Sequence, residues 1–154
     1  MVHIHQRESL PEQFTARLQG GNFNTGRGFL AFSPDAQRVD SYVAYEGSYT
    51  DGPFQNAGRY RRDNLNANFT RALSNRQKLG FRGLFGRNNF YSSGQLPLDL
   101  VASGELDRFG FIDDSLGGRV KLATGSTYYS REFENGGVFK ADRSEERRVG
   151  KECA

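Results

Sequence analysis

The sequence predicts an all-β fold, an antiparallel up-and-down meander of about seven strands. Residues 1–142 contain no apolar stripe with the 3.6-residue period of an amphipathic helix. Apolar and polar residues alternate instead, in runs that are rich in β-branched and aromatic residues, which is the pattern of strands. The expected strands are residues 13–21, 28–33, 38–50, 62–73, 78–88, 119–131 and 137–142.

The first three expected strands differ in length. Residues 13–21 and 28–33 are short runs, and the glycine-rich segment between them predicts a turn. Residues 38–50 form a longer run that places charged residues such as Asp40 and Glu46 at even positions. Its odd positions include Val39, Val43, Tyr45 and Tyr49. One face of this strand is therefore predicted to be apolar and aromatic.

The clearest alternation lies in residues 62–73, where a row of polar side chains on one face needs contact with water. Residues 78–88 repeat the pattern with Leu79, Phe81 and Phe85 at odd positions. The four-residue connection 74–77 predicts that these two runs pair as a hairpin. Residues 119–131 alternate more weakly, and residues 137–142 form a last short run.

We expect the meander to have a polar, concave face and an apolar face. The polar face, the lumen of a closed barrel, is expected to carry Asn64, Asn66, Asn68, Arg82 and Lys121. The apolar face, directed toward lipid, is expected to carry Leu65, Phe69, Phe81 and Leu122. In an incomplete barrel these apolar side chains are expected to be exposed over a patch larger than the few hundred Å² found on soluble monomers.

Strand length and loop length both favour a membrane-spanning barrel. Four expected strands have about 11 to 13 residues, close to the 9 to 11 needed to cross a membrane at a tilt. Short connections (34–37, 74–77 and 134–136) alternate with long ones (51–61 and 89–118), as they do in outer-membrane barrels. The mean hydropathy of −0.71 does not oppose this prediction, because barrel strands place apolar residues singly between polar ones.

Composition argues against several other classes of protein. The chain has 154 residues, enough for one ordinary domain, and its net charge of +3 is spread without a basic block before the last dozen residues. Nucleic-acid binding is therefore not expected. Cys153 is the single cysteine, and His3 and His5 have no neighbouring ligand motif, so no metal site is expected. No catalytic residue or cofactor is predicted, since the loop acids lack a histidine, a lysine or a nucleophile beside them.

The two ends of the chain differ from the middle. Residues 1–12 are expected to be a polar lead-in, residues 13–142 the partial barrel, and residues 143–154 a disordered or artefactual tail. The tail string RSEERRVGKEC (143–153) carries seven charges and no strand or helix period. It also resembles the conceptual translation of a short-read sequencing adapter, which implies that the reading frame leaves its gene near Asp142.

Several segments together resemble the barrel of TonB-dependent outer-membrane receptors. Residues 49–56 (YTDGPFQN) and 61–65 (RRDNL) are similar to the part that runs through the second extracellular loop. Residues 93–98 (SGQLPL), 101–104 (VASG) and 106–113 (LDRFGFID) resemble the next large loop, before the glycine pair 117–118 opens the descending strand. Residues 20–27 (GGNFNTGR) resemble the first loop. The order and spacing of these segments carry the resemblance.

The resemblance implies a role in transport. Such receptors form a 22-stranded barrel closed by an N-terminal plug, and the TonB complex drives import of scarce ligands across the bacterial outer membrane. The chain contains neither the plug nor the TonB-contacting segment, so it is expected to be an internal piece that does not transport by itself. The expected partners are outer-membrane lipid and, in the full-length receptor, the plug domain, the TonB complex and an unknown imported ligand. An extracellular β-sandwich binding module and a small free-standing barrel are the alternatives.

The long connection 89–118 is the expected place for ligand contacts, because the longest loop would face the side from which cargo arrives. It combines apolar residues with polar and charged ones. The candidate ligand residues are Gln95, Asp99, Glu105, Asp107, Arg108, Asp113 and Asp114. The equally open alternative is that this loop only covers the barrel mouth, with Pro97, Phe109 and Phe111 as internal anchors.

Overall fold

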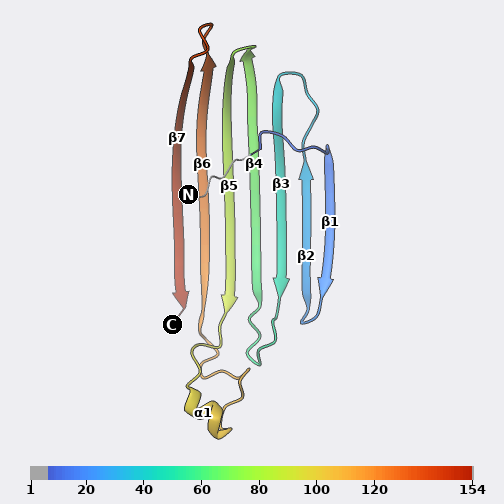
Figure 1. The fold of residues 1–154 in the computed structure, drawn as a ribbon. Helices are drawn as coiled ribbons and strands as arrows, with labels where there is room; N and C mark the ends of the chain where they lie inside the picture. Colours follow the sequence, from blue (N-terminus) through green and yellow to red (C-terminus); the bar gives the residue numbers. More distant parts are fainter. Residues whose placement is uncertain (1–6, 154) are drawn as a thin grey trace.

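The computed structural model describes residues 7–153 and consists of one antiparallel sheet (Figure 1). Seven strands lie side by side in sequence order, each paired with the next. The all-β meander predicted from the sequence is confirmed. The strands are β1 (Phe14–Gly21), β2 (Thr25–Phe32), β3 (Val39–Thr50), β4 (Tyr60–Ser74), β5 (Gln77–Tyr91), β6 (Gly117–Glu132) and β7 (Val138–Cys153).

The predicted hairpin is confirmed as the pair β4–β5. Phe69 lies opposite Phe81 and Leu65 opposite Phe85, and the two strands join through a tight turn at Asn75 and Arg76. Both strands are longer than the alternation indicated, at 15 residues each. Most of the extra residues lie near the long loops, where Arg61 is opposite Asn89 and where aromatic residues such as Phe90 and Tyr91 extend β5; Ser74 and Gln77 extend the strands at the tight turn.

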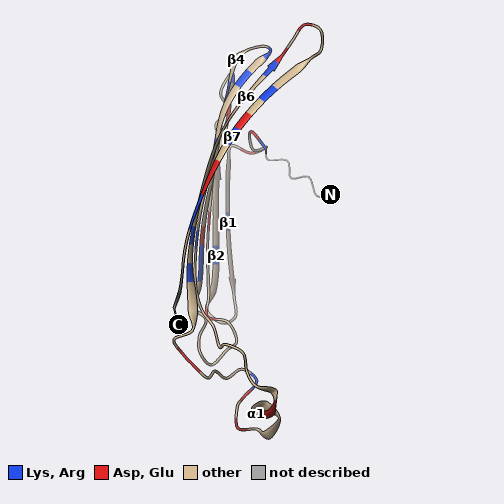
Figure 2. Cartoon of the chain, turned by 90° about the vertical axis from the view of Figure 1, so that its left-hand side faces the viewer, with Lys and Arg blue, Asp and Glu red and all other residues tan. Residues whose placement is uncertain are grey.

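The sheet is open and bowed. Strand β1 pairs only with β2 and β7 only with β6, so within residues 7–153 both edges of the sheet are unpaired. Seen from the side, the strands bend toward the side that carries the N-terminal segment and helix α1 (Leu98–Ser103) (Figure 2). This curvature and the missing closure are those expected of an incomplete barrel.

The sheet has two chemically different faces and almost no core. Residues that lie opposite one another in a ladder share a face, and side chains alternate between faces along each strand. One face, here called the polar face, carries Asn64, Asn66, Asn68 and Arg82; the other, the apolar face, carries Leu65, Phe69, Phe81 and Phe85. Ala31 is the only buried hydrophobic residue among those described. The sheet is therefore held mainly by its backbone ladders.

The expected facing of β6 is wrong. Lys121 lies opposite Arg87 and therefore on the apolar face, whereas Leu122 lies opposite Gly86 and therefore on the polar face. The physical reason is register. Alternation within one strand separates two faces, but only the pairing with β5 decides which face each set joins, and a shift of one residue exchanges them.

The tail also differs from its expectation. Residues 143–153 continue β7 and pair with β6 along its whole length, rather than remaining unpaired. Every side chain of residues 138–150 is exposed, so this pairing buries nothing apolar. Arg143, Glu145 and Arg147 lie on the apolar face, opposite Thr127, Gly125 and Ala123, and they interrupt its apolar character at this edge.

The connections are of unequal length at the end of the sheet that carries α1. Residues 51–59 and 92–116 form long loops there, whereas β1 and β2 join through a tight turn at residues 22–24, in which Phe23 and Asn24 have positive φ. The resemblance of residues 20–27 to a receptor's first loop therefore corresponds here to a hairpin turn. The long connection, predicted as 89–118, is observed as 92–116 and contains the short helix α1, which is followed by Gly104 in the left-handed conformation.

Candidate functional site

A hydrogen-bonded cluster occupies the middle of the polar face. Asn68 and Thr70 are buried, and the Asn68 Nδ2 donates to Thr70 Oγ1 at 3.0 Å. The Tyr128 hydroxyl, from β6, donates to Asn68 Oδ1 at 3.3 Å and also bonds the Thr70 hydroxyl. These neutral groups satisfy one another, so the cluster ties three adjacent strands rather than presenting free polar atoms.

A glycine makes room for this cluster. Gly80 lies opposite both Thr70 and Tyr128, and a Cβ at this position would overlap the Tyr128 ring. The guanidinium of Arg82 stacks over the same ring, with its Cζ 4.2 Å from the ring centroid. Gly80 therefore lets Tyr128 lie flat across β5, where it contacts a cation on one side and the Thr70 hydroxyl at its tip.

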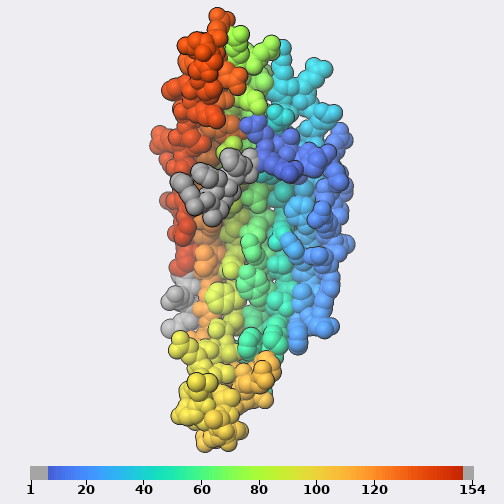
Figure 3. Space-filling model, in the orientation of Figure 1, coloured from blue at the N-terminus to red at the C-terminus, as the bar shows by residue number. Residues whose placement is uncertain are grey.

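Residues 7–12, the described part of the N-terminal lead-in, lie against the polar face (Figure 3). The backbone carbonyl of Glu8 accepts a hydrogen bond from Asn68 Nδ2 at 2.7 Å, and the Glu8 carboxylate lies 3.0 Å from Lys78 Nζ. Further along, Leu10 N donates to Ser33 Oγ at 3.0 Å. Residues 7–12 are thus held against the sheet, and Glu8 covers the cluster around Asn68.

The opposite face exposes large apolar side chains. Phe69 and Phe81 are each 50% exposed, Phe85 is 43% exposed, and Leu65 is 40% exposed. Within the described residues there is one sheet, so no second sheet covers them. The prediction that Leu65, Phe69 and Phe81 lie together and exposed is confirmed, and the burial of these rings that the sandwich alternative requires is not found within residues 7–153.

The two long loops are tied to each other into a cap. Gln55 N donates to the carbonyl of Phe109 at 2.9 Å, and the rings of Phe54 and Phe109 pack edge to face with centroids 6.1 Å apart. Tyr91 N donates to the carbonyl of Gly58 at 2.7 Å. Phe109 therefore acts as an anchor between the loops, as the covering alternative expects.

The candidate ligand residues of the long loop do not converge. All of them are exposed. Asp107 accepts a hydrogen bond from Phe109 N at 2.7 Å, and Asp113 accepts from Ser115 N at 2.8 Å and Ser115 Oγ at 2.6 Å. These bonds from Ser115 hold the pKa of the Asp113 carboxyl below its ordinary value. The acids thus stabilise local turns, and ligand contact by Gln95, Asp99, Glu105, Arg108 and Asp114 stays a prediction.

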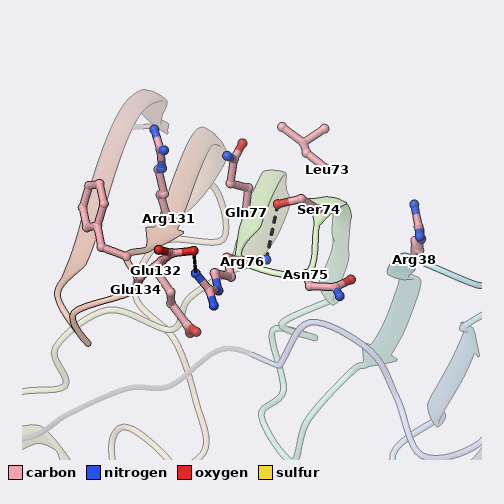
Figure 4. Close-up of a pocket in the computed structure, with 10 residues that line it drawn as sticks. Arg38, Leu73, Ser74, Asn75, Arg76, Gln77, Arg131, Glu132 and Glu134 are labelled. Atoms are coloured by element: carbon pink, nitrogen blue, oxygen red, sulfur yellow. Dashed lines mark hydrogen bonds and ion pairs between the residues drawn. The ribbon is translucent and has the colours of Figure 1, made fainter.

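A hollow lies at the other end of the sheet, between the β4–β5 and β6–β7 turns (Figure 4). Its volume is about 700 Å³, and Arg76 Nη1 crosses it to Glu134 Oε1 at 2.9 Å. Arg38 and Arg131 line its sides. Because both members of this ion pair are more than half exposed, the hollow is an open gap between turns and not an enclosed site.

Two features of the site escaped sequence reasoning. The Tyr128 cluster joins residues 58 or 60 positions apart, and only the strand register brings them together. The strand register also brings together a group of cations at the loop end of the apolar face. These are Arg61, Arg87, Arg119 and Lys121. The available signal was the change at the odd positions of residues 60–91 from leucine and phenylalanine to charged residues; residues 119–131 carry no such signal, because their odd positions after Lys121 are Ala123, Gly125 and Thr127.

Other kinds of site are not found in the part of the chain that is described. Residues 7–153 contain no group of three His, Cys, Asp or Glu side chains that could hold a metal ion. His3 and His5 lie outside these residues. No helix within the same range is long and apolar enough to cross a membrane. Comparisons of the chain with protein-family models, curated proteins and solved structures gave no match.

Proposed function

We propose that the chain is a segment of the membrane-spanning barrel of a TonB-dependent receptor, which imports a scarce ligand across the bacterial outer membrane. The observation that carries the proposal is the exposed apolar face of an open, bowed meander whose other face is polar. A soluble domain buries such a face, whereas a barrel turns it toward lipid and keeps the polar face for the lumen.

Dimensions support the membrane assignment. The stretch of β4 from Leu65 to Leu73 extends about 27 Å along the strand, given a rise of about 3.4 Å per residue, and on the apolar face it contains one charged residue, Arg71. This is close to the apolar band of about 25 Å that outer-membrane barrels present to lipid. Strands β4 to β6, at 15 and 16 residues, continue beyond that band at the loop end.

The receptor part of the proposal rests on the order and spacing of the segments that resemble this family. The two segments 49–56 and 93–113 contribute to the tied loops of the cap, at the end where a receptor receives its cargo. The proposed partners are lipid around the apolar face and, in a full receptor, a plug domain inside the barrel and the TonB complex. The unpaired edges β1 and β7 require further strands, so the segment alone does not transport.

Folding of the 154-residue chain in water and in lipid tests the proposal. The chain is diluted from urea into buffer alone or into buffer with phosphatidylcholine vesicles, and the β signal is measured by circular dichroism together with vesicle flotation. We expect the β signal and flotation to appear together, only with vesicles, and in assemblies of several chains, because the open edges β1 and β7 must pair with other copies in lipid. A folded monomer in buffer that does not float with vesicles would overturn the proposal.

A further inference from the structure

A cluster of cations lies on the apolar face at its loop end. Arg61 on β4, Arg119 and Lys121 on β6 and Arg87 on β5 share this face by register. Arg59, directly before β4, borders the same region. We call these five residues the rim cluster. They mark the point at which each strand passes from apolar to charged side chains.

The rim cluster is compact. Arg61 and Arg119 both lie opposite Asn89, and Lys121 lies opposite Arg87, two residues further along the strands. Adjacent strands are about 4.8 Å apart, so the backbone positions of these four cations lie within about 10 Å across the sheet and about 7 Å along it. Arg59, Arg61 and Arg119 line a hollow of about 240 Å³ together with Tyr49 and Tyr91.

One acid on the apolar face lies among these cations. Asp63 accepts a hydrogen bond from the Tyr45 hydroxyl at 2.7 Å and pairs with Arg61 Nε at 3.2 Å. Arg87 Nε is buried without a hydrogen-bond partner. Five cations against this acid leave the rim cluster with an excess of four positive charges, which favours an anionic ligand.

The surface beside the rim cluster is apolar. Toward the middle of the sheet, the pair Leu65 and Phe85 lies two residues from the pair Asp63 and Arg87. The pair Phe69 and Phe81 lies four residues further in the same direction. A ligand that meets this surface with good complementarity has an anionic head and a hydrocarbon body. Arginine binds phosphate oxygens in a bidentate manner, and cations at the edge of a lipid-facing band cost about 0–1 kcal/mol, against about 2–4 kcal/mol at its middle.

We propose that the rim cluster binds the phosphate headgroup of an anionic lipid whose acyl chains lie along Leu65, Phe69, Phe81 and Phe85. The proposal rests on the membrane assignment given under Proposed function and adds a lipid specificity to it. The lipid is held by its headgroup charge at the loop end and by contact of its chains with the exposed rings.

Binding to vesicles of two compositions tests the proposal. The 154-residue chain is titrated with phosphatidylcholine vesicles that contain or lack phosphatidic acid, and the floated fraction is measured. We expect at least about tenfold tighter binding to vesicles with phosphatidic acid, because each surface cation contributes about 1 kcal/mol toward an anionic membrane. In the variant R61Q/R119Q/K121Q we expect this preference to be lost.

The matched control is R71Q/R131Q/R143Q, which removes three cations of the same face outside the rim cluster. It is expected to keep the preference; an equal loss in both variants would show attraction by net charge alone and overturn the proposal. Inorganic phosphate is expected not to compete with the wild-type chain for the vesicles. If it abolishes the preference, the cluster is a site for free anions and the lipid proposal fails, whether or not the variants fold. Failure to bind neutral vesicles at all contradicts the membrane assignment instead.

Discussion

The two faces of the sheet are built from the same strands but are stabilised in different ways. On the polar face, Asn68, Thr70 and Tyr128 bond to one another and the lead-in covers them. On the apolar face, Phe69, Phe81 and Phe85 remain open although they are the largest apolar groups of their strands. A soluble protein usually buries the apolar side and wets the polar side. The proposed assignment of the apolar face to lipid accounts for this reversal.

The largest expected effect comes from placing a charge in the middle of the apolar face. For F81R we expect the chain in vesicles to lose about 2–4 kcal/mol of unfolding free energy, because an arginine in mid-bilayer must leave water. The control is L84R on the polar face, where the new cation stays hydrated and the change is expected to be small. Urea titrations followed by circular dichroism measure both. Equal losses of unfolding free energy in F81R and L84R would contradict the assignment of different surroundings to the two faces.

A smaller effect is expected from filling the space that Gly80 leaves for Tyr128. G80A is expected to cost about 1–3 kcal/mol, since the new methyl group overlaps the ring and must displace it from Arg82 and Thr70. G83A serves as the control, because a Cβ there meets Phe81 Cε1 at an ordinary 3.5 Å. The same urea titration applies. If the two alanine variants lose equal stability, the Tyr128 packing is not what Gly80 provides.

The lead-in offers a weaker test of the polar face. E8Q removes the ion pair with Lys78, whose members are 34% and 47% exposed, so we expect a loss of less than about 1 kcal/mol. The expected signature is faster proteolysis after Arg7, with no change in the β signal. E12Q is a suitable control, since Glu12 bonds only Thr15 nearby. Slower or unchanged cleavage in E8Q would mean that the bonds of the Glu8 carbonyl to Asn68 and of Leu10 N to Ser33 hold the lead-in without the ion pair.

The smallest effect concerns the loop cap and its dependence on pH. The pKa of Asp113 is lowered by the bonds from Ser115, so the ordered turn is favoured above the ordinary value of 3.8 and this contribution is lost as pH falls through the lowered pKa. Titration of the Asp113 carboxyl by NMR is expected to give a higher pKa in S115A than in the wild-type chain. An unchanged pKa in S115A would contradict the role given to the hydroxyl.

The sequence was sufficient for the fold class and the β4–β5 hairpin because these depend on local alternation and a short turn. It was not sufficient for β6. Val120 and Leu122 alternate with Arg119 and Lys121, so the two pairs must lie on opposite faces. Which pair lies on which face depends on the register between β6 and β5. No local sequence signal fixes this register, because the connection 92–116 between the two strands has 25 residues. A charged residue was assigned to the polar face, whereas Lys121 lies at the edge of the apolar one.

The candidate ligand residues were less predictable than the strands. The acidic residues of the loop were selected as ligand candidates from composition alone. Asp107 and Asp113 instead accept hydrogen bonds from backbone N–H groups two residues further along, as aspartates in turns often do. The anchor role of Phe109 was foreseeable as an alternative because a large apolar residue in an exposed loop needs a partner. Its actual partner, Phe54, comes from the other long loop, and only the arrangement of strands brings the two together.

The most direct test of the central claim compares two neighbouring residues on opposite faces. Leu84 and Phe85 are 38% and 43% exposed, and the chain contains no tryptophan, so L84W and F85W each introduce a single probe of one face. In vesicles with brominated acyl chains, we predict strong quenching and blue-shifted emission for F85W, and quenching by aqueous iodide for L84W. Equal accessibility of both probes to iodide, or quenching of L84W and not F85W by the brominated lipid, would contradict the assignment of the apolar face to lipid.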